Sequence, residues 1–196
     1  KIIMKNQEEH IYMCGIVGYI GNKSGTNIVL DGLEALEYRG YDSAGIALID
    51  NGDSKVYKQV GRVSGLIDAV NADKPTANLV IGHTRWATHG APSKRNAHPH
   101  HVGDIYLVHN GIIENYQDLK IMLMNHGHDF KSDTDSEVLA ALIDHLAQET
   151  DTVHQAVSGA LKMVVGTYGI ALFSAKDPDE IIVARRGSPL ILGLGD

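Results

Sequence analysis

The residue best suited to covalent chemistry is Cys14, the single cysteine of a 196-residue chain. A lone cysteine cannot form an internal disulfide, so it is a buried small side chain, a metal ligand or a reactive thiol. Its neighbour favours the thiol, because Cys14 directly follows Met13 and an initiator methionine is usually removed before a small side chain. Removal would give Cys14 a free α-amine, whose pKa of about 7.7–8.0 suits a general base. Nucleophile and base would then share one residue, as in enzymes with an N-terminal threonine nucleophile.

Three further segments carry polar residues that no fold requires, and each lies where we predict a strand to end or a helix to begin. They are Gly82–Gly90 (GHTRWATHG), His109–Gly111 (HNG) and Ser132–Glu137 (SDTDSE). Residues at such positions are exposed and yet firmly anchored, which suits the presentation of reactive groups. Taken singly, Arg85 and Asp135 could be an ordinary surface pair or a cap, and Asn110-Gly111 is a common turn dipeptide. The four segments together favour a functional site.

Strands and helices must position these segments. The apolar runs predict strands over 16–20, 43–50, 55–60, 78–82, 105–108, 168–174 and 180–184. Helical periodicity predicts helices over 27–38, 64–71, 114–125, 138–148 and 153–165. Thr26 is the expected cap of the first helix, and Thr134 and Glu137 have the spacing of a capping box.

The connections between these elements indicate the fold class. The turn Asn51-Gly52-Asp53 predicts a hairpin, and 83–103 is predicted to be a long loop because it is rich in Gly, Pro and His. A loop of that length inside a compact domain is usually functional. The helices cluster in sequence instead of alternating with strands, which indicates a layered α+β fold with largely antiparallel sheets.

Composition excludes several classes of partner. The chain is 43% hydrophobic and carries a net charge of −7 without long charge runs, which argues against nucleic acid or an anionic membrane as a partner. No apolar run approaches the ~20 residues of a membrane span, and the N-terminus has no secretory signal pattern. We therefore expect one compact cytoplasmic domain.

The eleven histidines suggest a metal site, but their spacing does not support one. Proline interrupts His98-Pro99-His100-His101 and glycine interrupts His126-Gly127-His128, so neither cluster has the i,i+4 spacing of a helical zinc site. The glycines at 15, 18 and 21 are not part of a strand-loop-helix unit that would bind a nucleotide. We expect neither a metal nor another cofactor.

Six motifs, in order along the chain, resemble those of the class II, N-terminal-nucleophile glutamine amidotransferases. They are MCGIVGYIG at 13–21, LEYRGYDSAG at 36–45, GHTRWATHG at 82–90, NAHPH at 96–100, HNGIIENY at 109–116 and SDTDSE at 132–137. The Cys-Gly-Ile string is shared across this superfamily. The second and third motifs are similar to the glucosamine-6-phosphate synthase branch, whereas phosphoribosyl-pyrophosphate amidotransferases carry different residues there. The resemblance runs from Met13 to the end of the chain.

This resemblance implies a fold and a catalytic centre. The implied fold is the four-layer αββα sandwich of N-terminal-nucleophile hydrolases. Cys14 would attack the side-chain amide of L-glutamine and form a thioester while ammonia leaves. Asn110 and the backbone N–H of Gly111 would form the oxyanion hole, and loss of one such donor lowers a rate by about 10²–10³.

The resemblance also implies substrate-binding residues. Arg85 would hold the α-carboxylate in a bidentate fork, and Asp135 would accept the α-ammonium. Trp86, Thr88 and His89 would line the same wall. Together these roles imply selection of a free amino acid.

The resemblance finally implies a larger enzyme around a type 2 glutamine amidotransferase domain at 13–196. Its ammonia would serve a C-terminal isomerase domain that converts fructose 6-phosphate to glucosamine 6-phosphate, and the full-length enzyme would be a homodimer. Residues 1–12 depart from the family pattern and are expected to be a leader from too early a start codon, a processed propeptide or an expression remnant. With the Cys14 nitrogen blocked, the alternative is a catalytically silent glutamine-binding module. Another alternative is the glutaminase domain of a different class II amidotransferase.

Overall fold

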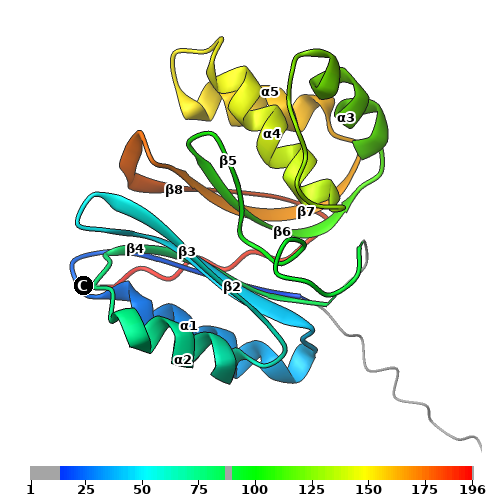
Figure 1. Cartoon of the computed structure of the whole chain (residues 1–196). Helices are drawn as coiled ribbons and strands as arrows, with labels where there is room; N and C mark the ends of the chain where they lie inside the picture. The colour runs from blue at the N-terminus through cyan, green and yellow to red at the C-terminus, as the bar shows by residue number, and fades with distance from the viewer. Residues whose placement is uncertain (1–13, 87–89, 196) are drawn as a thin grey trace, which may run out of the picture.

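Two β-sheets lie face to face at the centre of the molecule, and helices cover both outer faces (Figure 1). The computed structural model describes residues 14–86 and 90–195. Three of the predictions above, for the segment 1–12, Thr88 and His89, therefore lie outside the described residues.

The first sheet contains the hairpin predicted from the Asn-Gly turn. In the order in which they pair, its strands are Gly15–Ile20 (β1), Leu79–Arg85 (β4), Ser43–Asp50 (β2) and Asp53–Val60 (β3). All neighbours are antiparallel. Asn51 and Gly52 have φ values of 53° and 88°, the left-handed backbone that a two-residue hairpin turn requires.

The second sheet is also antiparallel in the described part of the chain. Its strands, in pairing order, are His100–Val102 (β5), Ile105–Ile113 (β6), Gly166–Ser174 (β7) and Asp177–Arg186 (β8). Consecutive strands in the sequence pair with each other throughout this sheet. Short turns join β5 to β6 and β7 to β8, whereas the long segment 114–165, which carries three helices, joins β6 to β7.

Helices pack on the outer faces of both sheets. The first sheet is covered by Gly25–Leu36 (α1), which continues into the 3-10 turn Glu37–Arg39 (η1), and by Val63–Asp73 (α2). The second is covered by Asp135–Ala147 (α4), flanked by Tyr116–Asn125 (α3) and Val153–Met163 (α5). The predicted α+β fold, a four-layer αββα sandwich, is confirmed (Figure 1).

Apolar side chains fill the three spaces between these four layers. Between the two sheets, Ile81 of β4 and Val108 of β6 belong to a cluster that also contains Phe173 of β7. Val80 and Leu107, one residue earlier on β4 and β6, point the opposite way into the helix-facing clusters. This period of two decides which polar side chains at the strand ends enter the space between the sheets.

Several strands are longer than the sequence predicts, and in two of them, β4 and β6, the extra length contains the polar motifs. His83–Arg85 continues β4 instead of opening the predicted loop, and His109–Gly111 lies within β6 instead of following it. Their polar side chains suggested loops, yet their backbones complete ladders with β2 and β7. The motifs are therefore held by sheet hydrogen bonds.

One cap prediction is confirmed and another is wrong. Thr134 caps α4 by accepting a hydrogen bond from the backbone N–H of Glu137, as the capping-box spacing predicts. Thr26 is not the cap of α1, because that helix begins one residue earlier, at Gly25. The Thr26 hydroxyl instead donates to the carbonyl oxygen of Pro75.

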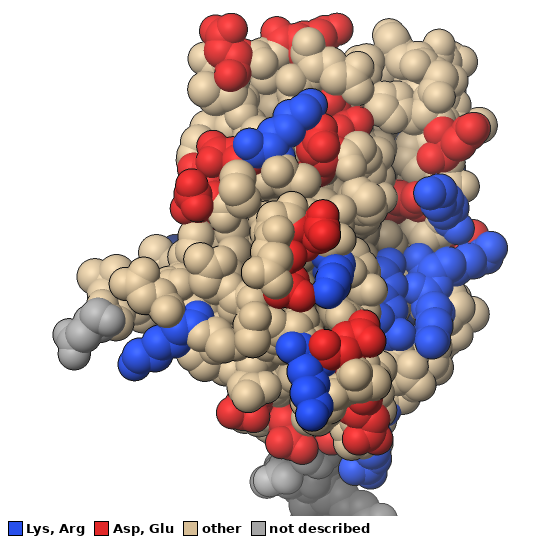
Figure 2. Space-filling model, turned by 60° about the vertical axis from the view of Figure 1, so that its left-hand side comes forward, with Lys and Arg blue, Asp and Glu red and all other residues tan. Residues whose placement is uncertain are grey.

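On the face in Figure 2, acidic and basic side chains are scattered among uncharged ones, with several basic side chains together at the right and acidic ones at the top. The mixture agrees with a chain whose 24 acidic and 17 basic residues form no long runs of one sign. Among the described helices, none combines the length and the apolar character that a membrane crossing requires.

Candidate functional site

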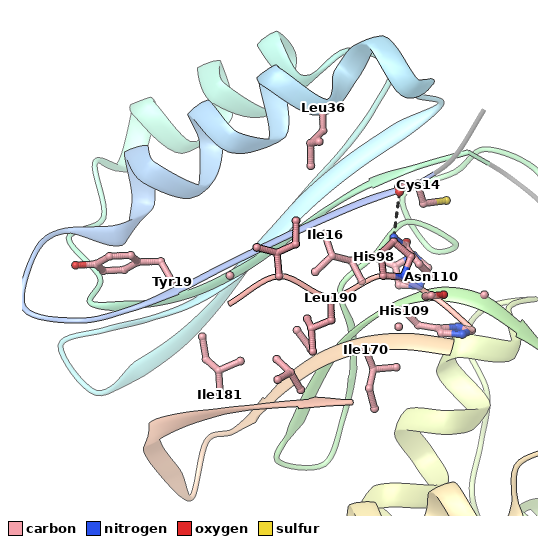
Figure 3. Close-up of a pocket in the computed structure, with 18 of the residues that line it drawn as sticks. Cys14, Ile16, Tyr19, Leu36, His98, His109, Asn110, Ile170, Ile181 and Leu190 are labelled. Atoms are coloured by element: carbon pink, nitrogen blue, oxygen red, sulfur yellow. Dashed lines mark hydrogen bonds between the residues drawn. The ribbon is translucent and has the colours of Figure 1, made fainter. Parts of the chain in front are cut away.

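A cavity of about 1120 Å³ opens between the two sheets. The described residues predicted to act on substrate all line it, namely Cys14, Arg85, Trp86, Asn110, Gly111 and Asp135. Figure 3 shows Cys14, His98, His109 and Asn110 at one end, whereas Ile16, Ile170, Ile181 and Leu190 line the remainder. The cavity thus has a polar end that carries the reactive groups and a largely apolar body.

Strand periodicity explains why the polar groups converge. Ile81 points into the space between the sheets, so His83 and Arg85, two and four residues later on β4, point the same way. Val108 likewise directs Asn110 of β6 toward the opposing sheet. The two sheets therefore present these side chains to each other at the same end of the molecule.

Cys14 directly precedes β1 and lies beside the end of β4. Its Sγ accepts a hydrogen bond from the backbone N–H of Trp86 at 3.2 Å. Burial raises the pKa of the Cys14 thiol above its ordinary value of 9.0, and the Trp86 N–H and the charge of Arg85 only partly oppose this effect. The thiol is therefore protonated at neutral pH, and it needs a base before it can act as a nucleophile.

Asn110 links the two sheets at Cys14. Its Nδ2 donates to the carbonyl oxygen of Cys14 at 3.0 Å, the dashed contact in Figure 3. Its Oδ1 lies 2.7 Å from Nε2 of His83. The neighbouring Gly111 has a φ of 139°, and a Cβ there would collide with the carbonyl oxygen of Thr167. Only glycine fits this part of β6 without strain.

Arg85 and Asp135 bring opposite charges to the cavity wall. Arg85 is 4% exposed, and its guanidinium donates to the carbonyl oxygen of Gly90 at 3.0 Å and lies 3.6 Å from the Asp42 carboxylate. Asp135 is the first residue of α4 and accepts a hydrogen bond from the backbone N–H of Ile113 at 2.8 Å. A buried cation and a buried anion in one cavity can bind a zwitterion.

The sequence interpretation missed a buried histidine cluster behind these residues. His83 and His98 have ring centroids 4.1 Å apart, and His98 and His100 4.7 Å apart. Burial lowers the pKa of His83 to about 3 and holds the pKa values of His98 and His100 well below 6.5. Burial also lowers the pKa of His109, whose Nδ1 lies 2.8 Å from the Ser136 hydroxyl. These imidazoles are neutral and act as hydrogen-bonding or packing groups.

Strand alternation was the signal that could have revealed His83, since it lies two residues after the apolar Ile81. The spacing of the histidines in sequence bears on metal binding and does not reveal this cluster. Among the described residues, no group of three or more His, Cys, Asp or Glu side chains is placed to hold a metal ion.

Comparison with known proteins identifies similar chains. A family model described as a glutamine amidotransferase domain matches residues 83–192. The chain is 53% identical over 191 residues to the glutamine–fructose-6-phosphate aminotransferase [isomerizing] of Chlorobaculum tepidum, covering 94% of this chain and 31% of that protein. For the protein of the same name from Pyrococcus horikoshii, the identity is 46% over 185 residues, with coverage of 93% and 31%. The chain thus spans about a third of the length of these relatives.

Solved structures share the fold. A phosphoribosylpyrophosphate amidotransferase from B. subtilis, complexed with ADP and GMP, is 28% identical with a TM-score of 0.75 over 87% of this chain and 36% of that one. A structure titled as the allosteric regulatory enzyme of purine biosynthesis is 29% identical with a TM-score of 0.76, covering 87% and 37%.

Proposed function

The chain belongs to the glutamine amidotransferase family, and from this membership we propose that it hydrolyses L-glutamine to glutamate and ammonia at Cys14. The observation that carries the proposal is the convergence on one cavity of a thiol, an amide donor and a pair of opposite charges. Cys14, Asn110, Arg85 and Asp135 supply these groups from separate elements. The thiol and the amide donor would act on the side-chain amide of glutamine, and the two charges would bind its α-carboxylate and α-ammonium.

The reaction begins with proton transfer. The Cys14 thiol is protonated at neutral pH, so it needs the nearest competent base, which is the α-amine of Cys14 itself when that residue is N-terminal. The sulfur then attacks the side-chain carbonyl carbon of glutamine, and the carbonyl oxygen becomes an oxyanion. The amide of Asn110 and the N–H of Gly111 donate to this oxyanion.

Collapse of the tetrahedral intermediate releases ammonia and leaves a thioester. The leaving nitrogen takes the proton that the α-amine had accepted, which restores the base. Water then attacks the thioester carbonyl, delivers a proton to the same amine and gives glutamate. The thiol is regenerated when the departing sulfur takes that proton back.

Selection of a free amino acid follows from the charges in the cavity. Arg85 binds the α-carboxylate and Asp135 the α-ammonium, while Trp86 contributes to the wall of the site. We assign Thr88 and His89 to the same wall from their motif. A zwitterion makes a charge-assisted contact with each of these two residues, whereas a substrate with its α-carboxylate amidated or its α-amine acylated would lose one of the two contacts.

The relatives suggest the use of the ammonia. Their name couples glutamine to fructose 6-phosphate, so we propose that the ammonia converts fructose 6-phosphate to glucosamine 6-phosphate in a C-terminal isomerase domain of a cytoplasmic homodimer. Residues 13–196 would form the glutaminase domain, with 1–12 as an extension. The chain's share of about 31% of the relatives' length fits one domain of such an enzyme.

The decisive experiment compares a chain that begins at Cys14 with the chain that begins at Lys1. In a coupled glutamate assay, the first should release glutamate from glutamine, and its Cys14→Ala variant should not. The longer chain should bind glutamine in calorimetry without turning it over, because its Cys14 nitrogen is an amide. Equal turnover by both chains would refute the free-amine mechanism. Absence of turnover in the chain beginning at Cys14 would refute glutamine hydrolysis by this domain.

A further inference from the structure

We propose that His83 is a positioning residue that fixes the orientation of the Asn110 amide, so that its N–H groups face the reaction centre. The inference rests on the proposed function, because it assigns a purpose to a residue behind the oxyanion hole. His83 does not reach the cavity itself, and it would act only through Asn110.

The hydrogen-bonding partners determine the direction of each contact. The carbonyl oxygen of Cys14 only accepts hydrogen bonds, so the Asn110 atom 3.0 Å from it is the Nδ2 donor. The Oδ1 of Asn110 then faces His83 at 2.7 Å. Because Oδ1 also only accepts, Nε2 of His83 must carry the proton.

Burial keeps His83 in this protonation state. Its side chain is fully buried, and burial lowers its pKa to about 3, so it is neutral throughout the range in which the enzyme would work. A neutral imidazole with its proton on Nε2 has no proton on Nδ1. Nδ1 has no partner within hydrogen-bond geometry among the described residues, and the nearby backbone of His109 offsets only part of the effect of burial on the His83 pKa.

The tautomer of His83 therefore determines which way the Asn110 amide points, and so whether the oxyanion hole contains a donor or an acceptor. With the proton on Nδ1, the lone pair of Nε2 would face Oδ1 and favour a flipped Asn110 amide. A flipped amide would direct its oxygen at the Cys14 carbonyl and at any developing oxyanion, and both contacts would be repulsive. The terminal torsion of asparagine is soft, so the amide needs a partner on each side to keep one orientation.

The scaffold holds the His83 ring rigidly. His83 lies in the central strand β4, paired with Ile16 of β1 on one side and Gly45 of β2 on the other. Its ring packs against His98 with centroids 4.1 Å apart. Asn110 belongs to the other sheet, so the His83–Asn110 contact joins the two sheets next to the contact between Asn110 and Cys14.

The test uses matched replacements in the active chain. In His83→Gln, the side-chain amide nitrogen can occupy the place of Nε2, whereas the shorter side chain of His83→Asn cannot reach it and His83→Leu has no donor. We expect kcat for glutamine to fall on the order of 10- to 100-fold in His83→Asn and His83→Leu, somewhat less than the loss of a whole donor. We expect KM to stay within about twofold and His83→Gln to keep most of the activity.

A second readout separates positioning from a general structural role. The γ-aldehyde of glutamate adds to a thiol as a hemithioacetal whose oxygen would occupy the oxyanion hole, whereas the product glutamate forms no such adduct. His83→Asn should weaken inhibition by the aldehyde by about the same factor as kcat/KM falls and leave inhibition by glutamate unchanged. Thermal unfolding identifies any variant that fails to fold, and the Gln and Asn variants differ by only one methylene.

The outcomes are distinguishable. Equal activity of the Asn and Gln variants, or equal losses of aldehyde and glutamate binding, would overturn the role of His83. A wild-type chain beginning at Cys14 that does not hydrolyse glutamine would instead overturn the proposed function. In the Asn110→Ala variant, the additional replacement His83→Asn should lower kcat little, because the side chain that His83 positions is already absent.

Discussion

The side-chain amide of Asn110 in the second sheet donates a 3.0 Å hydrogen bond to the carbonyl oxygen of Cys14, which precedes the first strand of the other sheet. The two residues are 96 positions apart in sequence. This contact fixes the candidate nucleophile against the candidate oxyanion donor. Both depend on the same packing between sheets, so catalytic geometry should be lost if that packing changes.

Replacing Asn110 with Asp tests whether its donors matter. Aspartate keeps the size of the side chain and an acceptor for His83, but it removes the N–H groups that face Cys14. We expect kcat to fall by about 10²–10³ or more with little change in KM, because a transition-state contact is lost. Steady-state kinetics of Asn110→Asp and Asn110→Ala measure this effect, and a decrease confined to KM would contradict it.

Gly111 should not tolerate a side chain. A Cβ at this residue would press on the backbone carbonyl of Thr167, and its φ of 139° disfavours any other residue. We expect Gly111→Ala to lower the free energy of unfolding by about 1–3 kcal/mol from backbone strain, with the collision adding to this loss. Urea unfolding should show the difference.

The matched control for this replacement is Gly52→Ala in the hairpin turn. Gly52 also has a positive φ, 88°, but a Cβ there would meet nothing within 4 Å. The decrease in the free energy of unfolding for Gly52→Ala should be smaller, on the order of 1 kcal/mol, since only the backbone conformation opposes this replacement. Equal losses at both positions would show that the contact with Thr167 is unimportant.

The layered fold could be predicted from sequence because local signals agreed with it. The Asn51-Gly52 turn between two β-rich runs specified the hairpin, and the Thr134–Glu137 spacing specified the start of α4. These signals act between residues that are close in the chain. Such short-range signals depend on local backbone geometry, so they can be recognised without knowledge of the tertiary structure.

The site could be predicted only in part. The sequence motifs identified Cys14, Arg85, Asn110 and Asp135 as parts of one site. The predicted ends of β4 and β6 came too early in the sequence, because the polar residues there are typical of loops. A polar residue in a strand is favourable when it faces a cavity, and that depends on the opposing sheet. The partnership of His83 with Asn110 joins two sheets, so no local pattern could have specified it.

The buried histidines should make the protein sensitive to acid. In the unfolded chain an imidazole has a pKa of about 6.5, whereas burial lowers the pKa of folded His83 to about 3. Between these values the unfolded state binds more protons, so stability rises with pH and falls on acidification. Each such imidazole should contribute about 1.4 kcal/mol per pH unit below 6.5.

Urea unfolding at several pH values tests this sensitivity. The midpoint should begin to fall just below pH 6.5, well above the range in which ordinary carboxylates titrate. His98→Phe should reduce the slope, because burial also holds the pKa of His98 well below 6.5 and no described residue hydrogen-bonds its ring nitrogens. A midpoint that stays constant between pH 6.5 and 5.5 would contradict the neutral-histidine assignment.

Charge selection by Arg85 and Asp135 can be tested separately from chemistry. Arg85→Lys keeps the charge but loses the planar fork, and Asp135→Asn keeps an acceptor for the N–H of Ile113 but loses the charge. Charge-assisted hydrogen bonds contribute about 1.5–3 kcal/mol, so KM for glutamine should rise about 10- to 150-fold in either variant, with a smaller change in kcat. The preference for glutamine over N-acetylglutamine should narrow in Asp135→Asn alone, because only that residue is assigned to the ammonium group. If the preference narrows equally in Arg85→Lys, the two charges do not bind separate ends of the substrate.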